Sequence, residues 1–260
     1  MGNSTNKNKL ETCLKNLRLS GVRAYYEELT LMAEQETMRY DEYLLELLLR
    51  ECELRYNNRI ARLLRESRLP LEKNFDNFDI KRLPPKLQHQ VKAILDGTFV
   101  DRKENILAFG NPGSGKTHLL SALGLELVHK NRRVLYTTCS LLVQELLIAK
   151  KELELKKVLR KLSRFDVLII DDFGYVQQER EEMEVLFTLM NFRYERESIM
   201  IASNLPFSKW EVIFKDPMTT AAAIDRLVHH SVILEMNIPS YRMEEAKKGE
   251  NRRGVRHASS

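Results

Sequence analysis

The stretch GNPGSGKTHLL, residues 110–120, constrains the fold of this 260-residue chain more than any other feature. It matches the pattern G-x-x-x-x-G-K-[ST] in full, and it lies between an apolar run at residues 106–109 and an amphipathic stretch. A strand, a loop of this pattern and a helix form the motif whose backbone N–H groups bind nucleotide phosphates. We therefore expect a nucleotide-binding α/β domain, with a glycine-rich turn that binds nothing as the alternative.

Within this phosphate loop, single side chains have distinct expected roles. Lys116 is expected to reach the β- and γ-phosphates of ATP, and Thr117 to place its hydroxyl on Mg²⁺. The residues expected to contact the nucleotide are Gly110, Asn111, Pro112, Gly113, Ser114, Gly115, Lys116, Thr117 and His118.

The segment VLIIDDF supplies the carboxylates that such a site needs. Four apolar residues, 167–170, run into Asp171 and Asp172. Two adjacent acids at the end of a buried strand are favoured where a cation or a water lies nearby. We assign Asp171 to the magnesium shell and Asp172 to polarising the attacking water; the alternative is a solvated strand end with two incidental acids.

A third apolar segment, SIMIASN, ends in Ser203 and Asn204. A polar side chain at the tip of a strand beside the metal strand could orient the water against the γ-phosphate, and we assign Asn204 this role. Asparagine also ends strands through turn preference alone, which is the alternative.

Periodicity divides the chain into parts. Residues 1–68 contain no proline and are rich in Leu, Glu, Lys and Arg, which predicts a small all-helical N-terminal domain. Residues 69–84 are expected to be a linker with aromatic anchors at Phe75 and Phe78. Residues 85–246 alternate short apolar runs with amphipathic stretches, which favours a mainly parallel sheet covered on both faces. Residues 247–260 are expected to be a disordered basic tail.

The composition limits the binding partners and the cellular compartment that we expect for this chain. With 43% hydrophobic and 30% charged residues and no long apolar run, the chain is expected to be cytoplasmic and free of membrane contact. Its three cysteines are far apart and lack metal-ligand spacing, which argues against a disulfide framework or a zinc site. A net charge of +5 favours an acidic partner, most simply nucleic acid.

The order of these motifs resembles the AAA+ ATPases, and more narrowly the IstB-like transposition helper proteins of bacterial insertion sequences, with DnaC-type helicase loaders as relatives. The likeness is carried by LKNLRLSGVRAYYEEL, FDNFD, ENILAFGNPGSGKTHL, FDVLIIDDFG, RYERESIMIASNLPFSKW, IDRLVHHS and PSYRMEE. It implies a five-stranded parallel ATPase core, homo-oligomers with nucleotide between subunits, and delivery of a transposase to DNA.

The resemblance also assigns two arginines. Arg226 in DRL matches the arginine finger that reaches the γ-phosphate of a neighbouring subunit, whereas the residues alone leave it a helix residue paired with an acid. Arg242 in SYR is the nearest match to a second nucleotide-sensing arginine. Most AAA+ proteins carry glutamate at the place of Asp172, which predicts slow hydrolysis. Few residues follow Arg226, which predicts a reduced or absent helical lid.

No motif that reads base sequence is present, so any DNA contact is expected to be with phosphates and largely independent of sequence. The basic residues assigned to DNA are Arg55, Arg59 and Arg62 on one helix face, and Lys150, Lys151, Lys156 and Lys157 in the tract KKELELKKVLRK. A solvated, self-paired helix is the alternative for that tract. His229 and His230 are interpreted as structural.

Together these features predict an ATP-controlled protein that oligomerises on duplex DNA and recruits a transposase, with hydrolysis ending the assembly. The alternative is a helicase-loader-like adaptor that holds a replicative helicase and hydrolyses ATP weakly.

Overall fold

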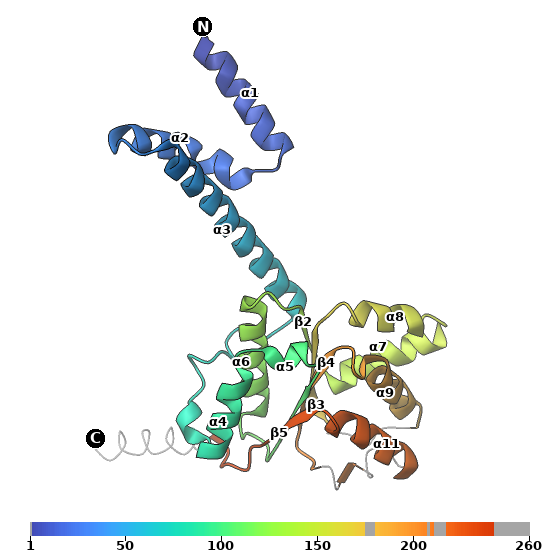
Figure 1. Cartoon of the computed structure of the whole chain (residues 1–260). Helices are drawn as coiled ribbons and strands as arrows, with labels where there is room; N and C mark the ends of the chain where they lie inside the picture. Colours follow the sequence, from blue (N-terminus) through green and yellow to red (C-terminus); the bar gives the residue numbers. More distant parts are fainter. Residues whose placement is uncertain (1, 175–179, 207–208, 211–216, 242–260) are drawn as a thin grey trace, which may run out of the picture. The chain divides into compact units, whose positions relative to one another are not determined.

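The computed structural model describes the chain except for residues 1, 175–179, 207–208, 211–216 and 242–260 (Figure 1). It forms two compact units, residues 1–62 and 63–260. The boundary falls inside the long helix α3 (Tyr40–Ser67), a few residues before the expected domain end at 68. The expected basic tail and Arg242 lie outside the described residues.

The N-terminal unit is helical, as predicted. It contains α1 (Gly2–Asn16), α2 (Ser20–Gln35) and most of α3. Its apolar core is small and consists of Leu14, Val22, Tyr26, Leu29 and Leu47.

A buried carboxylate ties α2 to α3 within this unit. Glu51 accepts hydrogen bonds from the backbone N–H groups of Gly21 (2.6 Å) and Val22 (3.1 Å) in the first turn of α2. Arg55 Nε donates to the same side chain over 2.6 Å. Burial alone would raise the pKa of Glu51, but the bonds from Arg55, Val22 and Gly21 hold it below its usual value. Helices α2 and α3 are therefore joined by a polar contact as well as by apolar packing.

The second unit is built on a five-stranded sheet, which confirms the predicted fold. Its strands are β1 (Asn105–Phe109), β2 (Val134–Thr138), β3 (Val167–Phe173), β4 (Ser198–Ser203) and β5 (Ser231–Glu235). All neighbouring pairs are parallel, in the order β2-β3-β4-β1-β5. Strands β1 and β4 are buried along their whole length, as parallel strands covered on both faces must be.

Helices cover both faces of this sheet (Figure 1). One face carries α4 (Pro85–Ile94), α5 (Thr98–Asp101) and α6 (Lys116–His129). The other carries α7 (Cys139–Lys151), α8 (Leu155–Leu162), α9 (Arg180–Arg193) and α11 (Pro217–Val228). None of the helices in the described ranges has the length and apolar content that crossing a membrane would need.

The segment 69–84, expected to be a linker, belongs to the second unit. Leu69 and Leu83 are buried, and the segment contains a short 3-10 helix, η1 (Ile80–Arg82). The segment lies beside the loop between β1 and α6, and residues of both line one cavity.

Candidate functional site

The phosphate loop lies between β1 and α6, as the motif predicts. Gly113 (φ +78°) and Gly115 (φ +95°) adopt left-handed backbone conformations that residues with a Cβ rarely tolerate. Gly115 is also the N-cap of α6, and glycine has no side chain with which to cap this helix end. The N–H groups of the first turn are therefore directed toward the loop, where an anionic phosphate would satisfy them.

Two polar side chains of the loop fit the same ligand. Lys116 is buried, and its Nζ donates hydrogen bonds to the carbonyls of Gly110 (2.8 Å) and Asn111 (2.9 Å). The hydroxyl of Ser114 is buried and has no hydrogen-bond partner among the described residues. A buried hydroxyl without a partner is costly unless a ligand satisfies it, and a phosphate oxygen would do so.

At the end of β3, Asp171 forms the centre of a hydrogen-bond network. Its Oδ1 accepts from Thr117 Oγ1 and from the backbone N–H of Asp172, each over 3.0 Å. Its Oδ2 accepts from the hydroxyl of Tyr136 on β2 over 2.7 Å. Burial and this bond to Asp171 raise the pKa of Tyr136, so its hydroxyl remains a donor.

This donor set suits Mg²⁺. A hydroxyl of the phosphate loop and a carboxylate of the neighbouring strand already lie within hydrogen-bond distance, and both offer the hard oxygen ligands that Mg²⁺ binds beside nucleotide phosphates. Thr117 and Asp171, the two residues assigned to the metal, are therefore the ones that would hold it.

Asp172 and Asn204 both line the same cavity as the phosphate loop. Asp172 is exposed, sits at φ +55° and lies within an irregularity in the pairing of β3 with β4, between Ile170 and Phe173. Asn204 directly follows β4. The structure thus brings the predicted water-orienting pair to the edge of the sheet where the phosphate loop lies, and their roles stay predictions.

The cavity has a volume of about 570 Å³, enough for a nucleotide-sized ligand. One wall comes from the expected linker, which the sequence did not assign to the site. The lining residues from this segment are Lys73, Asn77, Phe78, Asp79, Arg82 and Leu83. The two phenylalanines of FDNFD were the sequence signal for this wall, because an aromatic side chain that anchors a linker must pack against another part of the domain.

Contacts between the linker and α6 fix this wall. The ring of Phe78 lies 5.1 Å, centroid to centroid, from that of His118, and it also contacts the position where Gly115 would carry a Cβ. His118 Nε2 lies 2.8 Å from the carbonyl oxygen of Asn74. His118, predicted to contact the nucleotide, thus holds the linker against the start of α6.

The segment after β5 returns across the phosphate loop. The backbone N–H of Tyr241 donates to the carbonyl of Gly113 over 3.0 Å, and the guanidinium of Arg82 lies 4.9 Å from the Tyr241 ring centroid. A Cβ on Gly113 would collide with the hydroxyl of Ser240. Arg242, expected to sense nucleotide, follows directly but lies outside the described residues.

Arg226 is not part of this cavity. Its guanidinium lies 5.1 Å from the ring centroid of Phe187, so that α11 and α9 are in contact there. Its Nη1 is buried and has no hydrogen-bond partner within the described part of the chain. The guanidinium therefore packs on an aromatic ring, and its role as an arginine finger stays a prediction.

The residues assigned to DNA differ in their surroundings. Arg55, Arg59 and Arg62 are all exposed. Arg55 also pairs with Glu51 and donates from Nη2 to the carbonyl of Arg18. The tract KKELELKKVLRK is not one helix, because α7 ends at Lys151 and α8 begins at Leu155.

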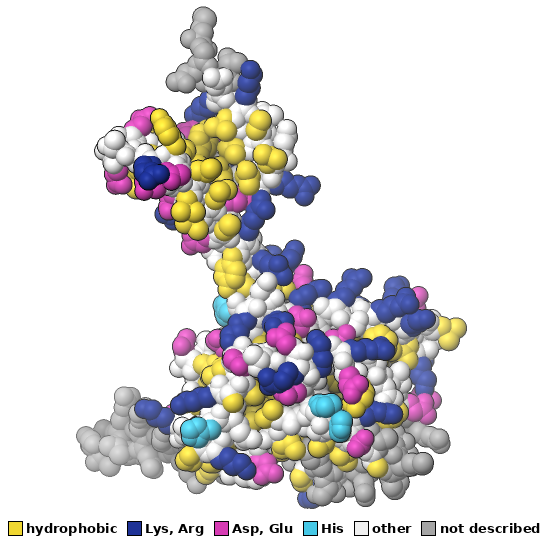
Figure 2. All heavy atoms as spheres, in the orientation of Figure 1, with side chains coloured by type: hydrophobic (Ala, Val, Ile, Leu, Met, Phe, Trp, Pro, Cys, Tyr) yellow, Lys and Arg dark blue, Asp and Glu magenta, His cyan; other side chains and the backbone are white. Residues whose placement is uncertain are grey.

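Within this tract, Lys150 pairs with Glu184, and Lys157 pairs with Glu154. Lys151 and Lys156 are exposed. Figure 2 shows basic and acidic side chains interspersed over the second unit. DNA contact by the tract stays a prediction. Lys151 and Lys156 are better placed to make this contact than the two lysines that already form ion pairs.

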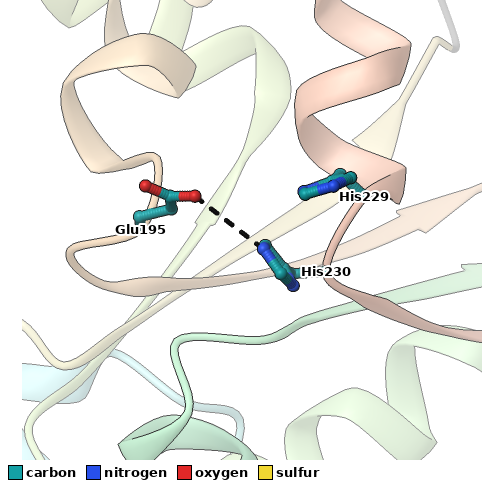
Figure 3. A group of neighbouring side chains, drawn as sticks. All are labelled: Glu195, His229 and His230. Atoms are coloured by element: carbon teal, nitrogen blue, oxygen red, sulfur yellow. Dashed lines mark ion pairs between the residues drawn. The ribbon is translucent and has the colours of Figure 1, made fainter.

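A further polar group lies away from the cavity. Figure 3 shows Glu195, after α9, beside His229 and His230, which connect α11 to β5. His230 Nε2 and Glu195 Oε1 are 3.8 Å apart, wider than the spacing of about 3.4 Å between two ligands of one tetrahedral zinc ion. All three side chains are exposed, and the group is an ion pair when His230 is protonated.

The structure shows a P-loop domain with the fold of the AAA+ class. Within that class, the chain belongs to the family of IstB-like ATP binding proteins, whose model matches residues 12–249. It is 40% identical over 253 residues to an insertion-sequence ATP-binding protein of Sinorhizobium fredii, covering 97% of this chain and 85% of that one. It is 36% identical over 240 residues to the insertion sequence IS21 ATP-binding protein of Pseudomonas aeruginosa, covering 92% and 91%.

Solved structures agree at the level of the fold. AMPPCP-bound DnaA from Aquifex aeolicus is similar with a TM-score of 0.54 and 21% identity, over 72% of this chain and 57% of that one. DnaI is similar with a TM-score of 0.53 and 18% identity, over 65% of this chain and 95% of that one. At these identities, the likeness shows a shared architecture.

Proposed function

We propose that this chain hydrolyses ATP with Mg²⁺ and serves an insertion sequence as a DNA-binding transposition helper. The observation that carries the proposal is the 3.0 Å hydrogen bond between Thr117 and Asp171 beside a nucleotide-sized cavity. The insertion-sequence relatives support the biological setting. A protein that acts on bacterial DNA and uses ATP would work in the cytoplasm.

The expected chemistry divides among the residues of the cavity. Lys116 and the N–H groups at the start of α6 bind the β- and γ-phosphates, and Thr117 and Asp171 hold Mg²⁺, which neutralises phosphate charge when bound. Asp172 and Asn204 orient the attacking water. The side chain of aspartate is shorter than that of glutamate, so we expect slow hydrolysis.

The proposal includes an oligomer in which Arg226 acts on the nucleotide of the next subunit. Its position outside the cavity of its own chain, with Nη1 lacking a hydrogen-bond partner among the described residues, supports a role in trans. The N-terminal unit exposes large apolar side chains, which supports association (Figure 2). These exposed side chains include Leu17, Leu31, Leu45 and Leu49.

Binding of duplex DNA is proposed to occur through phosphates. The net charge of +5 and the exposed lysines of α7 and α8 support it, and the absence of a base-reading motif in the sequence predicts little sequence preference. The assembly on DNA would then recruit the transposase of the same element.

The test measures ATP hydrolysis with Mg²⁺, with and without duplex DNA, for the native chain and for Lys116→Ala. We expect turnover that rises with DNA in the native chain and is absent in the variant. DNA affinity should fall steeply with salt and should not depend on sequence. Nucleotide binding without DNA-stimulated turnover, together with capture of a replicative helicase and not of the transposase, would favour the adaptor function.

A further inference from the structure

Tyr136 contacts the proposed metal site without belonging to any of its motifs. It lies in β2, beside β3, and its partner in the strand register is Ile169. Its ring is partly buried and lines the nucleotide cavity, and its hydroxyl donates to Asp171 Oδ2 over 2.7 Å.

The geometry at Asp171 shows why this bond matters. The torsion that turns a carboxylate plane about its Cβ–Cγ bond has a broad energy profile, so hydrogen bonds must fix its orientation. Thr117 and the backbone of Asp172 both donate to Oδ1, on one side of the group. Tyr136 is the donor to Oδ2. Without it, the carboxylate is restrained at one oxygen only.

We propose that Tyr136 is a positioning residue, whose hydroxyl fixes the plane of the Asp171 carboxylate so that Oδ1 stays beside Thr117. This inference rests on the proposed function, in which Asp171 holds Mg²⁺. The hydroxyl acts through Asp171, to which it donates. Partners of this kind behind a metal ligand typically change metal affinity by about 10- to 100-fold when removed.

The experiment uses the full chain and the substitution Tyr136→Phe, which removes the hydroxyl and keeps the ring. A fluorescent ATP analogue is titrated first in EDTA and then at increasing Mg²⁺, and thermal unfolding is followed without nucleotide. We expect unchanged affinity in EDTA, an unchanged unfolding midpoint and a Mg²⁺ midpoint raised about 10-fold. Tyr40→Phe is the matched control, because Tyr40 is 93% exposed and lies in the other unit.

A double-mutant cycle separates positioning from a general effect on the fold. In an Asp171→Asn background, Tyr136→Phe should leave the affinity for the ATP analogue in Mg²⁺ unchanged, because the tyrosine acts through that carboxylate, whereas a general effect on the fold would still lower this affinity. An unchanged Mg²⁺ midpoint in Tyr136→Phe overturns the inference. Weaker binding in EDTA together with a lower unfolding midpoint also overturns it, in favour of a purely structural role. If the native chain itself shows no Mg²⁺ dependence, the proposed function fails first.

Discussion

Thr117 and Asp171, 54 positions apart in the chain, are joined by a hydrogen bond of 3.0 Å between Oγ1 and Oδ1. The first residue belongs to the start of α6 and the second to the end of β3. In a parallel sheet, the carboxyl ends of the strands share one edge, so the fold itself brings a phosphate loop and a metal carboxylate together. This relationship makes substitutions at the two acids of β3 informative.

Asp171→Asn and Asp172→Asn form a matched pair at neighbouring positions. Asp171→Asn should abolish the Mg²⁺-dependent gain in ATP affinity, because it removes the charged ligand. Asp172→Asn should keep that gain and lose hydrolysis, because only the water-orienting group is changed. Isothermal titration with ATP in EDTA and in Mg²⁺, and phosphate release, measure the two effects. Equal loss of Mg²⁺ dependence in both variants would contradict the division of roles.

Arg226→Ala should keep ATP binding and lose DNA-stimulated turnover by roughly 10³–10⁵-fold, the usual contribution of an arginine finger. Arg196→Ala is the control, because Arg196 also lies over a phenylalanine ring, at 5.6 Å from that of Phe192. Phosphate release is the measurement.

Mixing variants tests whether this arginine acts between subunits. Arg226→Ala subunits bind ATP but lack the finger, whereas Lys116→Ala subunits supply the finger and bind no ATP. Mixing the two inactive variants should restore part of the turnover. No recovery at any mixing ratio, with assembly verified by mass measurement, would refute a role in trans.

Much of the second unit could be predicted because its signals are local. A buried parallel strand is apolar on both faces, so VLIIDDF and SIMIASN were recognisable as runs that end in polar residues. The phosphate loop was recognisable because its glycines meet a backbone requirement, which Gly113 and Gly115 show in their positive φ values. The roles proposed for Asp171 and Thr117 follow from their motifs and stay predictions, and the structure places the two residues within hydrogen-bond distance.

Other features depend on contacts between distant segments, which no local pattern encodes. Phe78 read as a linker anchor, but its role in the cavity wall follows from packing on His118, forty positions further along the chain. Arg55 read as one of three arginines on a helix face, yet Glu51 and the carbonyl of Arg18 engage it. Tyr136 belongs to none of the motifs recognised in the sequence, because only the pairing of β2 with β3 brings it to Asp171.

The assignment of the linker to the site can be tested with its two aromatics. Phe78→Leu should weaken ATP binding by about 1 kcal/mol, or roughly five-fold, because it replaces an aromatic wall of the cavity with an aliphatic one. Phe75→Leu removes a comparable ring that does not line the cavity and should leave ATP affinity unchanged. Equilibrium titration of a fluorescent ATP analogue measures both. Equal weakening in the two variants would indicate a general loosening of the segment.

The basic tract offers a comparison between lysines with and without an ion pair among the described residues. Lys151→Ala and Lys156→Ala should each weaken DNA binding and reduce the slope of log affinity against log salt by about 0.9, if each neutralises one phosphate. Lys150→Ala and Lys157→Ala should change it less, because Glu184 and Glu154 already engage these side chains. Fluorescence anisotropy with a labelled duplex across a salt series measures this. Identical slopes in all four variants and the native chain would exclude the tract from the DNA contact.

The buried carboxylate of the N-terminal unit predicts a pH dependence. Because hydrogen bonds hold the pKa of Glu51 below its usual value, its contribution to stability is complete above the usual pKa and is lost as pH falls through the lowered one. Glu51→Gln should therefore reduce the protection of α2 amides against hydrogen exchange at neutral pH by about 1.5–3 kcal/mol. The difference from the native chain should shrink at acidic pH. Glu53→Gln, an exposed glutamate on the same helix, is the control, and a difference that stays constant with pH would show that ionisation of Glu51 contributes nothing.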